Sequence, residues 1–163
     1  MAIFICSVCG HIEFGKAPDK CPVCMSPREK YSQNDNVFIE SEEKSKEAAI
    51  KHIPSVTINK ECKLIPGLPQ IPQTKYGEYP ANNKPELSCI DVIVRIGKAL
   101  HPMEATHYIR FIDCYVDDAY VSRVMLSPGV FAGACFHLKA RGNKVRIVEN
   151  CNIHGYWQLE EQL

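Results

Sequence analysis

The stretch THYIRFIDCYV, residues 106–116, decides the fold, because it opens a series of four short strand-like segments. AYVSRVML (119–126), GVFAGACFHLKA (129–140) and KVRIVEN (144–150) follow it, separated by the turn sequences DD, SPG and RGN. Just upstream, apolar residues alternate with others over residues 90–96. Closely spaced strands with no helical segment between them predict a mainly β domain, an antiparallel sandwich.

The segment GVFAGACFHLKA also predicts which side chains face the core. Ala132, Ala134, Phe136 and Leu138 share one face of a strand, which places His137 on the other face. A single histidine in that position is more often structural than a metal ligand. We therefore do not count His137 among the candidate ligands.

Three short motifs gather most of the remaining histidines. They are KHIP at residues 51–54, HPMEATH at 101–107 and CNIHG at 151–155, and together they supply four of the six histidines and one cysteine. Structural zinc sites close at four ligands, most often with two or more cysteines. A larger set of imidazoles with one thiolate suits a redox iron that keeps an open position.

The ordered motifs KHIP, HPMEATHYI and CNIHG resemble the catalytic core of the superoxide reductase family, also called desulfoferrodoxin and neelaredoxin. The resemblance covers roughly residues 47–163 and includes FIDCYVDDAYVSRVMLSPG. It implies a seven-stranded immunoglobulin-like fold. It also implies a ferrous iron with an axial sulfur, an open sixth position, and a lysine over that position that attracts superoxide. The ligands that it implies are His52, His101, His107, Cys151 and His154, and the lysine is Lys51.

The activity that this resemblance implies is one-electron reduction of superoxide to hydrogen peroxide. An axial thiolate pushes electron density onto iron, and we expect backbone N–H groups near Asn152 and Ile153 to tune the sulfur. Many members carry a glutamate before the lysine, which caps the ferric iron. Ile50 occupies that position here and cannot bind a metal; Glu47, one helical turn back, is a weak substitute.

The N-terminal residues carry a second metal-site pattern. Cys6 and Cys9, and again Cys21 and Cys24, are separated by two residues, so that four sulfurs can face one ion. A unit this short needs the metal to hold it together. The spacing suits zinc and iron equally; FICSVCGHIEFGKAPDKCPVC resembles the rubredoxin-like module of rubrerythrins, which favours iron in an electron relay. Since four sulfurs complete a tetrahedron, we expect His11 to face solvent.

Composition restricts the function and the compartment. The formal net charge is zero and the isoelectric point is near 7.0, which does not indicate nucleic-acid binding. No apolar run approaches the roughly 20 residues of a membrane span, and MAIFICSVCG has no basic start typical of a signal peptide. We therefore predict a cytoplasmic protein with no membrane partner. The cysteines outside the motifs are expected to be buried thiols: Cys62, Cys89, Cys114 and Cys135.

The predicted organisation is a rubredoxin-like four-cysteine domain (1–33), a charged linker (34–46) and a catalytic β-sandwich (47–163) with a proline-rich insertion near 60–86. A helix is expected from Ser41 to Pro54. The predicted partners are superoxide and an electron donor such as rubredoxin or its reductase, and we predict a homo-oligomer. Two alternatives stay open at this point: a peroxide-reducing non-haem iron enzyme, and a non-enzymatic electron-transfer protein.

Overall fold

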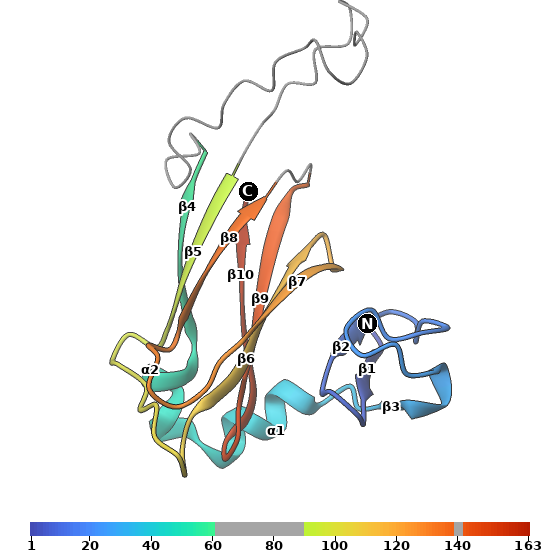
Figure 1. Ribbon diagram of the computed structural model, residues 1–163. Helices are drawn as coiled ribbons and strands as arrows, with labels where there is room; N and C mark the ends of the chain where they lie inside the picture. Colours follow the sequence, from blue (N-terminus) through green and yellow to red (C-terminus); the bar gives the residue numbers. More distant parts are fainter. Residues whose placement is uncertain (61–89, 139–141) are drawn as a thin grey trace, which may run out of the picture.

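The computed structural model describes residues 1–60, 90–138 and 142–163. Cys62, Cys89 and almost all of the predicted insertion at 60–86 lie outside the described residues. The described part of the chain is built mainly from strands, arranged as a small N-terminal sheet beside a larger pair of sheets (Figure 1). The predicted fold class, a mainly β chain with a small four-cysteine unit before a sandwich, is confirmed.

The small N-terminal sheet, called the ribbon below, holds the two Cys-x-x-Cys loops. Its strands are β1 (Ile3–Cys6), β2 (Ile12–Phe14) and β3 (Tyr31–Gln33), in the antiparallel order β2-β1-β3, with the 3-10 helix η1 (Arg28–Lys30) before β3. Gly10 closes the first cysteine loop at a φ of 71°, a conformation that favours glycine.

The larger unit, called the sandwich below, consists of two antiparallel sheets. One has the strand order β10-β9-β6-β7 and the other the order β4-β5-β8. Their strands are β4 (Pro54–Asn59), β5 (Ile90–Ile96), β6 (Ile109–Val116), β7 (Ala119–Met125), β8 (Gly133–Leu138), β9 (Lys144–Cys151) and β10 (Gly155–Gln162). Neighbouring strands are joined by hairpins over much of the four-stranded sheet, so cross-strand pairs fix its register.

Alternation along the strands fills the space between the two sheets. The core there includes Val92 and Ile96 from β5, Ile112 from β6 and Ile147 from β9, each fully buried. On β5, the buried residues Val92, Val94 and Ile96 recur at every second position, as a half-buried strand requires. The buried position expected for Cys114 is confirmed.

The sheet β4-β5-β8 of the sandwich presents a polar outer face. His137 lies on that face, as predicted, with its Nδ1 2.6 Å from Asp91 Oδ1 on the neighbouring strand. Cys135 lies on the same face of β8 and is exposed, so the prediction of a buried thiol there was wrong. The reason is that successive side chains of a strand point to opposite faces. Cys135 therefore lies on the same face as His137, and the core residues Phe136 and Leu138 lie on the other.

Short helices connect the ribbon to the sandwich. They are α1 (Val37–Lys44), the 3-10 helix η2 (Lys46–Ala48) and α2 (Ala49–His52). The helix expected from Ser41 therefore begins earlier, at Val37, and is interrupted at Ser45. Val37 and Phe38 are buried although they belong to the segment predicted as a charged linker. Within the described residues, no helix combines the length and apolar character that crossing a membrane requires.

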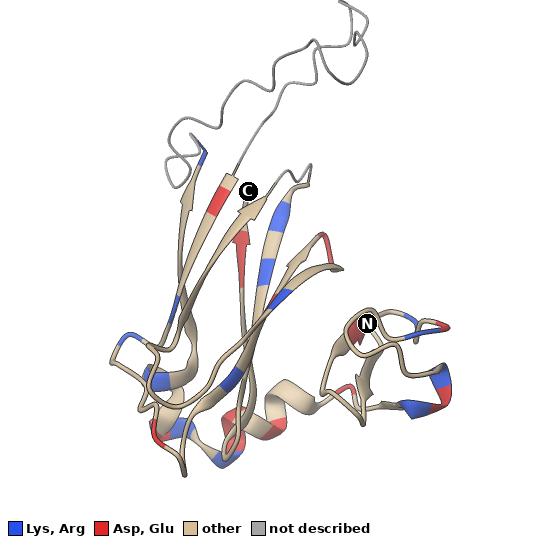
Figure 2. Cartoon of the chain, in the orientation of Figure 1, with Lys and Arg blue, Asp and Glu red and all other residues tan. Residues whose placement is uncertain are grey.

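The ribbon packs against the outer face of the four-stranded sheet. A single apolar cluster joins Ile12 and Phe14 of the ribbon, Phe38 of α1, and Tyr115 and Val148 of the sandwich. Charged residues of both signs occur in the ribbon and in the sandwich (Figure 2). The contact between the two units therefore combines this apolar cluster with buried polar side chains, among them His11 and Asp113, and does not depend on two surfaces of opposite charge.

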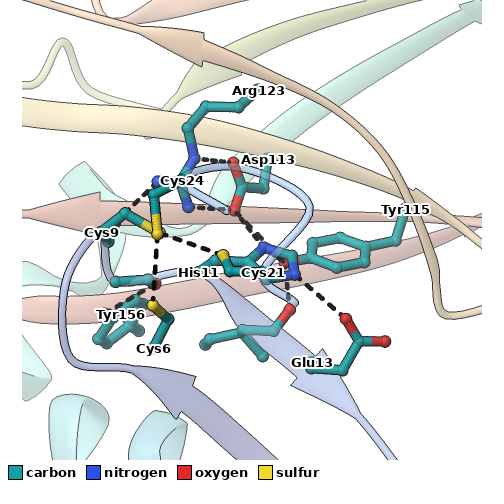
Figure 3. Close-up of polar contacts among 12 residues, drawn as sticks. Cys6, Cys9, His11, Glu13, Cys21, Cys24, Asp113, Tyr115, Arg123 and Tyr156 are labelled. Carbon is teal, nitrogen blue, oxygen red and sulfur yellow. Dashed lines mark hydrogen bonds and ion pairs between the residues drawn. The ribbon is translucent and has the colours of Figure 1, made fainter. Parts of the chain in front are cut away.

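His11 lies inside this contact, so the prediction that it faces solvent was wrong. Its side chain is fully buried and stacked on Tyr115, with Asp113 3.7 Å from its Nδ1 (Figure 3). The His11 ring also lies edge-on to Tyr120. The four sulfurs do leave His11 without a ligand role, but the sandwich supplies an acceptor and two aromatic rings for it. Hydrogen bonds to Asp113 and Glu13 outweigh burial and raise the pKa of His11.

Candidate metal centres

Four histidines and one cysteine, distant in sequence, meet at one end of the sandwich. His52 is the last residue of α2, His101 and His107 lie in the connection between β5 and β6, Cys151 ends β9, and His154 lies in the turn before β10. One donor atom from each lies within 4.8 Å of all the others. The structure thus brings together every residue of the predicted histidine–cysteine set.

The donor atoms point toward a common centre. His52 Nε2 is 3.0 Å from His154 Nδ1, which is also 3.2 Å from His107 Nε2 and 3.5 Å from Cys151 Sγ. His101 turns its Nδ1 to the carbonyl oxygen of Pro102, 2.6 Å away, so its Nε2 is left for the centre. That Nε2 atom is buried and has no partner among the described residues, as expected of an atom that binds a metal.

Three imidazoles of this cluster, those of His52, His101 and His107, are held in the neutral form that binds metals. Burial, reinforced by the neighbouring histidines and Lys51, lowers the pKa of His52 to about 3. Burial also lowers the pKa of His101 to about 4, and that of His107 falls below its usual range for the same reason. These three side chains therefore carry free nitrogen lone pairs at neutral pH.

Two loops fix the positions of the ligands. The Asn152 side chain accepts a hydrogen bond from the Tyr108 backbone N–H and donates one to the Thr106 carbonyl, which pins the HPMEATH loop to the β9–β10 turn. On the other side, Gly97 has a φ of 81°, and a Cβ there would lie 2.5 Å from the Lys51 carbonyl oxygen. Glycine therefore lets this loop approach the KHIP motif closely.

The backbone N–H groups of Ile153 and His154 act on the Cys151 thiol by lowering its pKa, whereas the Asn152 N–H donates to the Tyr108 carbonyl. Burial is the larger influence and raises the pKa of the Cys151 thiol, while these two N–H groups oppose the rise. A bound metal ion deprotonates a coordinating thiol, and the N–H groups then temper its electron donation.

Glu149 and Trp157 support His52 from behind, and the motifs did not predict them. Trp157 stacks on the His52 ring at 4.9 Å between centroids, and Glu149 Oε1 lies 3.4 Å from His52 Nδ1. Glu149 is fully buried, and burial raises its pKa well above the usual range. The stacked Trp157 ring holds the His52 ring in the orientation that directs Nε2 to the centre, and the carboxyl lies beside its Nδ1 without a hydrogen bond among the described residues. The alternation of Ile147, Glu149 and Cys151 on one face of β9 was the available signal.

Ile50 and Lys51 directly precede His52 in α2, and both are exposed. Lys51 is exposed, and its charge contributes to the lowered pKa values of His52 and His101 after burial and other near neighbours. The Ile50 side chain is 55% exposed. Neither residue is among the five with a donor atom in the cluster.

The four cysteines of the ribbon form the second candidate centre. Cys6 and Cys24 sulfurs are 3.7 Å apart, Cys9 and Cys21 sulfurs 3.5 Å apart, and all four lie within 4.8 Å of one another (Figure 3). The Ser26 hydroxyl lies 3.1 Å from Cys24 Sγ and lowers the pKa of this thiol to about 6. Four converging sulfurs fit a tetrahedral zinc or iron ion.

Both donor sets therefore fit a metal, and we expect two metal ions per chain. The reason is that the two groups are complete and share no residue. Elemental analysis of freshly purified protein, together with its visible spectrum, measures the content and distinguishes iron from zinc in the ribbon. One metal per chain, lost when Cys6 or Cys151 is replaced, would contradict two independent centres.

Comparisons with known proteins agree with this arrangement. A family model described as desulfoferrodoxin matches residues 78–160, half of the chain, and one described as the rubredoxin-like domain of rubrerythrin matches residues 4–32. His101, His107, Cys151 and His154 lie within the first match. His52 precedes it, so the place of His52 in the centre depends on the geometry described above.

Curated relatives and solved structures show the same likeness. A desulfoferrodoxin from Syntrophotalea carbinolica is 42% identical over 69 residues, which cover 42% of this chain and 52% of the relative. A putative superoxide reductase from Methanocaldococcus jannaschii is 26% identical over 99 residues, which cover 53% of this chain and 85% of the relative. The chain spans about half the length of the first of these relatives.

Among solved structures, a superoxide reductase (neelaredoxin) from Ignicoccus hospitalis has a TM-score of 0.51 at 22% identity, over 74% of this chain and 85% of the other. A likeness of this size supports the sandwich fold. The family model, the shared fold and the two sets of converging ligands agree, and the chain belongs to the desulfoferrodoxin family, with a rubredoxin-like domain at its N-terminus.

Proposed function

We propose that the chain is a superoxide reductase that reduces superoxide to hydrogen peroxide at an iron held by the histidine–cysteine centre. The observation that carries the proposal is the convergence of five donor atoms from separate parts of the chain on one centre beside an exposed lysine. The proposed ligands are His52, His101, His107, Cys151 and His154. Superoxide would be the substrate, and each turnover would consume one electron and two protons.

When bound, the ferrous ion would supply one electron to superoxide, and the chain's own residues would arrange the reaction around it. The imidazoles of His52, His101 and His107 would hold the ion without adding charge, and the Cys151 sulfur would increase its electron donation. Lys51 would attract the anionic substrate toward the open side and stabilise the charge of the reduced product. Ribbon iron, held by Cys6, Cys9, Cys21 and Cys24, would receive electrons from a donor such as rubredoxin or its reductase.

The proposed function is tested by mixing fully reduced protein with a known pulse of superoxide. We expect one hydrogen peroxide for each superoxide consumed, oxidation of the histidine–cysteine iron, and no release of oxygen. Evolution of oxygen would indicate dismutation instead. A faster reaction with hydrogen peroxide than with superoxide would make peroxide the substrate.

Replacing Lys51 with alanine is expected to slow the capture of superoxide. A single cation beside the open position raises the association rate of an anion by about tenfold, the low end of electrostatic steering. The second-order rate constant should fall by that factor and lose part of its dependence on salt, while the iron content stays the same. Lys46→Ala is the control, because it removes an exposed cation of η2 away from the cluster. If Lys46→Ala lowered the rate constant as much as Lys51→Ala, the effect would come from the net charge of the protein and not from the position of Lys51.

Because Ile50 replaces the glutamate of many family members, we expect the oxidised histidine–cysteine centre to bind added anions. An alkyl side chain offers no sixth ligand, so azide should bind the ferric protein readily and shift its visible spectrum. Ile50→Glu is expected to weaken azide binding by placing a carboxylate near the open position. A carboxylate bound to the ferric iron of the unmodified protein, for example from Glu47 or Glu104, would contradict this prediction.

A further inference from the structure

The ribbon is attached to the sandwich through the backbone of its first cysteine loop. Side chains of the four-stranded sheet donate hydrogen bonds to three carbonyl groups of that loop and the strand after it (Figure 3): Arg123 Nη1 to Cys9 at 2.8 Å, Tyr156 Oη to Gly10 at 3.0 Å and Tyr115 Oη to Ile12 at 2.8 Å. The four-cysteine centre therefore rests on the sheet of its own chain, and its first loop is held at three points.

A buried ion pair reinforces this attachment. The Arg123 guanidinium makes two hydrogen bonds of 2.6 Å to the Asp113 carboxylate, and both side chains are almost completely buried. The guanidinium also lies 3.5 Å above the Phe111 ring centroid. Planar, two-point pairing of this kind fixes orientation as well as position. The cysteine loop and the sheet thus keep one relative placement.

The hydrogen bond from Tyr156 differs from the other two because its donor lies close in the chain to the histidine–cysteine centre. Tyr156 is two residues from His154, whose Nδ1 belongs to that centre. Tyr115 lies near the end of β6 that is farther from His107. Of the three side chains that donate to the ribbon, only Tyr156 lies within two residues of a ligand of the histidine–cysteine centre.

Both ends of the Tyr156 contact are held closely. Gly10 has a φ of 71°, and a Cβ at that position would lie 2.8 Å from the Tyr156 hydroxyl, so a residue without a side chain permits the close approach. On the other side, the Tyr156 backbone N–H donates to the Ser41 hydroxyl at 3.0 Å. Ser41 is itself buried and donates to the Val37 carbonyl in α1. Hydrogen bonds therefore hold Tyr156 at both ends, at its hydroxyl by Gly10 and at its backbone by Ser41.

We propose that Tyr156 is the bridge through which one electron passes from the four-cysteine centre to the histidine–cysteine centre. The connection runs from Cys9 to the Gly10 carbonyl, across the 3.0 Å hydrogen bond to Tyr156, and through Gly155 to His154. It consists of covalent bonds and that one hydrogen bond. Ferrous iron in the ribbon is oxidised and ferric iron at the histidine–cysteine centre is reduced, with no bond made or broken. The proposal rests on the proposed function, because it needs redox-active iron at both centres.

The test compares Tyr156→Phe with Tyr115→Phe in the iron-loaded full chain. Each change removes one hydroxyl that donates to a ribbon carbonyl, but the Tyr115 hydroxyl does not lie on the proposed connection. A laser flash reduces the ribbon iron through an added photoreductant in the absence of superoxide. The visible spectra of the two centres then give the rate constant of electron transfer between them, and their reduction potentials are measured separately.

We expect Tyr156→Phe to lose most of the inter-centre rate at unchanged potentials, and Tyr115→Phe to keep the parent rate. An unchanged rate in Tyr156→Phe, or equal losses in both variants, would overturn the bridge and assign the hydroxyls to docking alone. Failure of the proposed function has a different signature. In that case, fully reduced unmodified protein would not consume superoxide, whatever the inter-centre rate.

Discussion

Replacing Cys151 with serine is expected to abolish superoxide reduction while leaving iron in the ribbon. The sulfur ends β9 inside the histidine–cysteine centre, 3.5 Å from His154 Nδ1, and is buried. A serine oxygen cannot supply the electron donation of a thiolate. Replacing residues that only hydrogen-bond to metal ligands already costs about 10- to 100-fold in affinity or activity, so loss of the proposed sulfur ligand itself should exceed that range.

The measurement is the rate at which reduced protein consumes a pulse of superoxide, together with the iron content of each centre. Cys135→Ser is the matched control, because it makes the same chemical change at an exposed thiol of β8. The control should keep the parent rate. A Cys151→Ser protein that retains its iron and reduces superoxide at the parent rate would remove the thiolate from the proposed mechanism.

The three motifs, together with the family resemblance that they carry, predicted which residues meet in the histidine–cysteine centre, because metal-binding side chains can be recognised by residue type. His52, His101 and Cys151 are far apart in the chain, yet each lies in a short motif whose spacing is readable without knowledge of the fold. The strand pattern likewise predicted the sandwich, since alternation of side chains follows from backbone geometry. These features are local, and local features can be read from a sequence.

The features that the sequence did not reveal depend on contacts between units. His11 was expected in solvent because nothing near it in the chain predicts that β6 and β7 cover it with Asp113, Tyr115 and Tyr120. Glu149 could have been found, because its parity on β9 places it beside Cys151. Because charged residues usually lie at the surface, the burial of the Glu149 carboxyl beside His52 was not expected from residue type alone.

Replacing Cys6 with serine is expected to separate the two halves of the proposed catalytic cycle. Cys6 is buried, with its sulfur 3.7 Å from that of Cys24 and 3.2 Å from the Ser26 hydroxyl. Structural metal sites of this type supply about 10–16 kcal/mol to the folding of small units. Loss of one sulfur should therefore release or perturb the metal and loosen the cysteine loops, while the sandwich core, which contains no ribbon residue, stays folded.

Because the histidine–cysteine centre keeps all five ligands in this variant, protein reduced in advance should still consume one equivalent of superoxide at nearly the parent rate. Repeated turnover with an electron donor should fall sharply, since the relay is lost. Circular dichroism and iron analysis check that the sandwich and its iron remain. Cys151→Ser should show the reverse pattern, failing already in the first turnover. If Cys6→Ser lost the first turnover as completely as Cys151→Ser, the two centres could not be relay and catalyst, and the attachment of the ribbon through Arg123 and Tyr156 would instead have a structural effect on the histidine–cysteine centre.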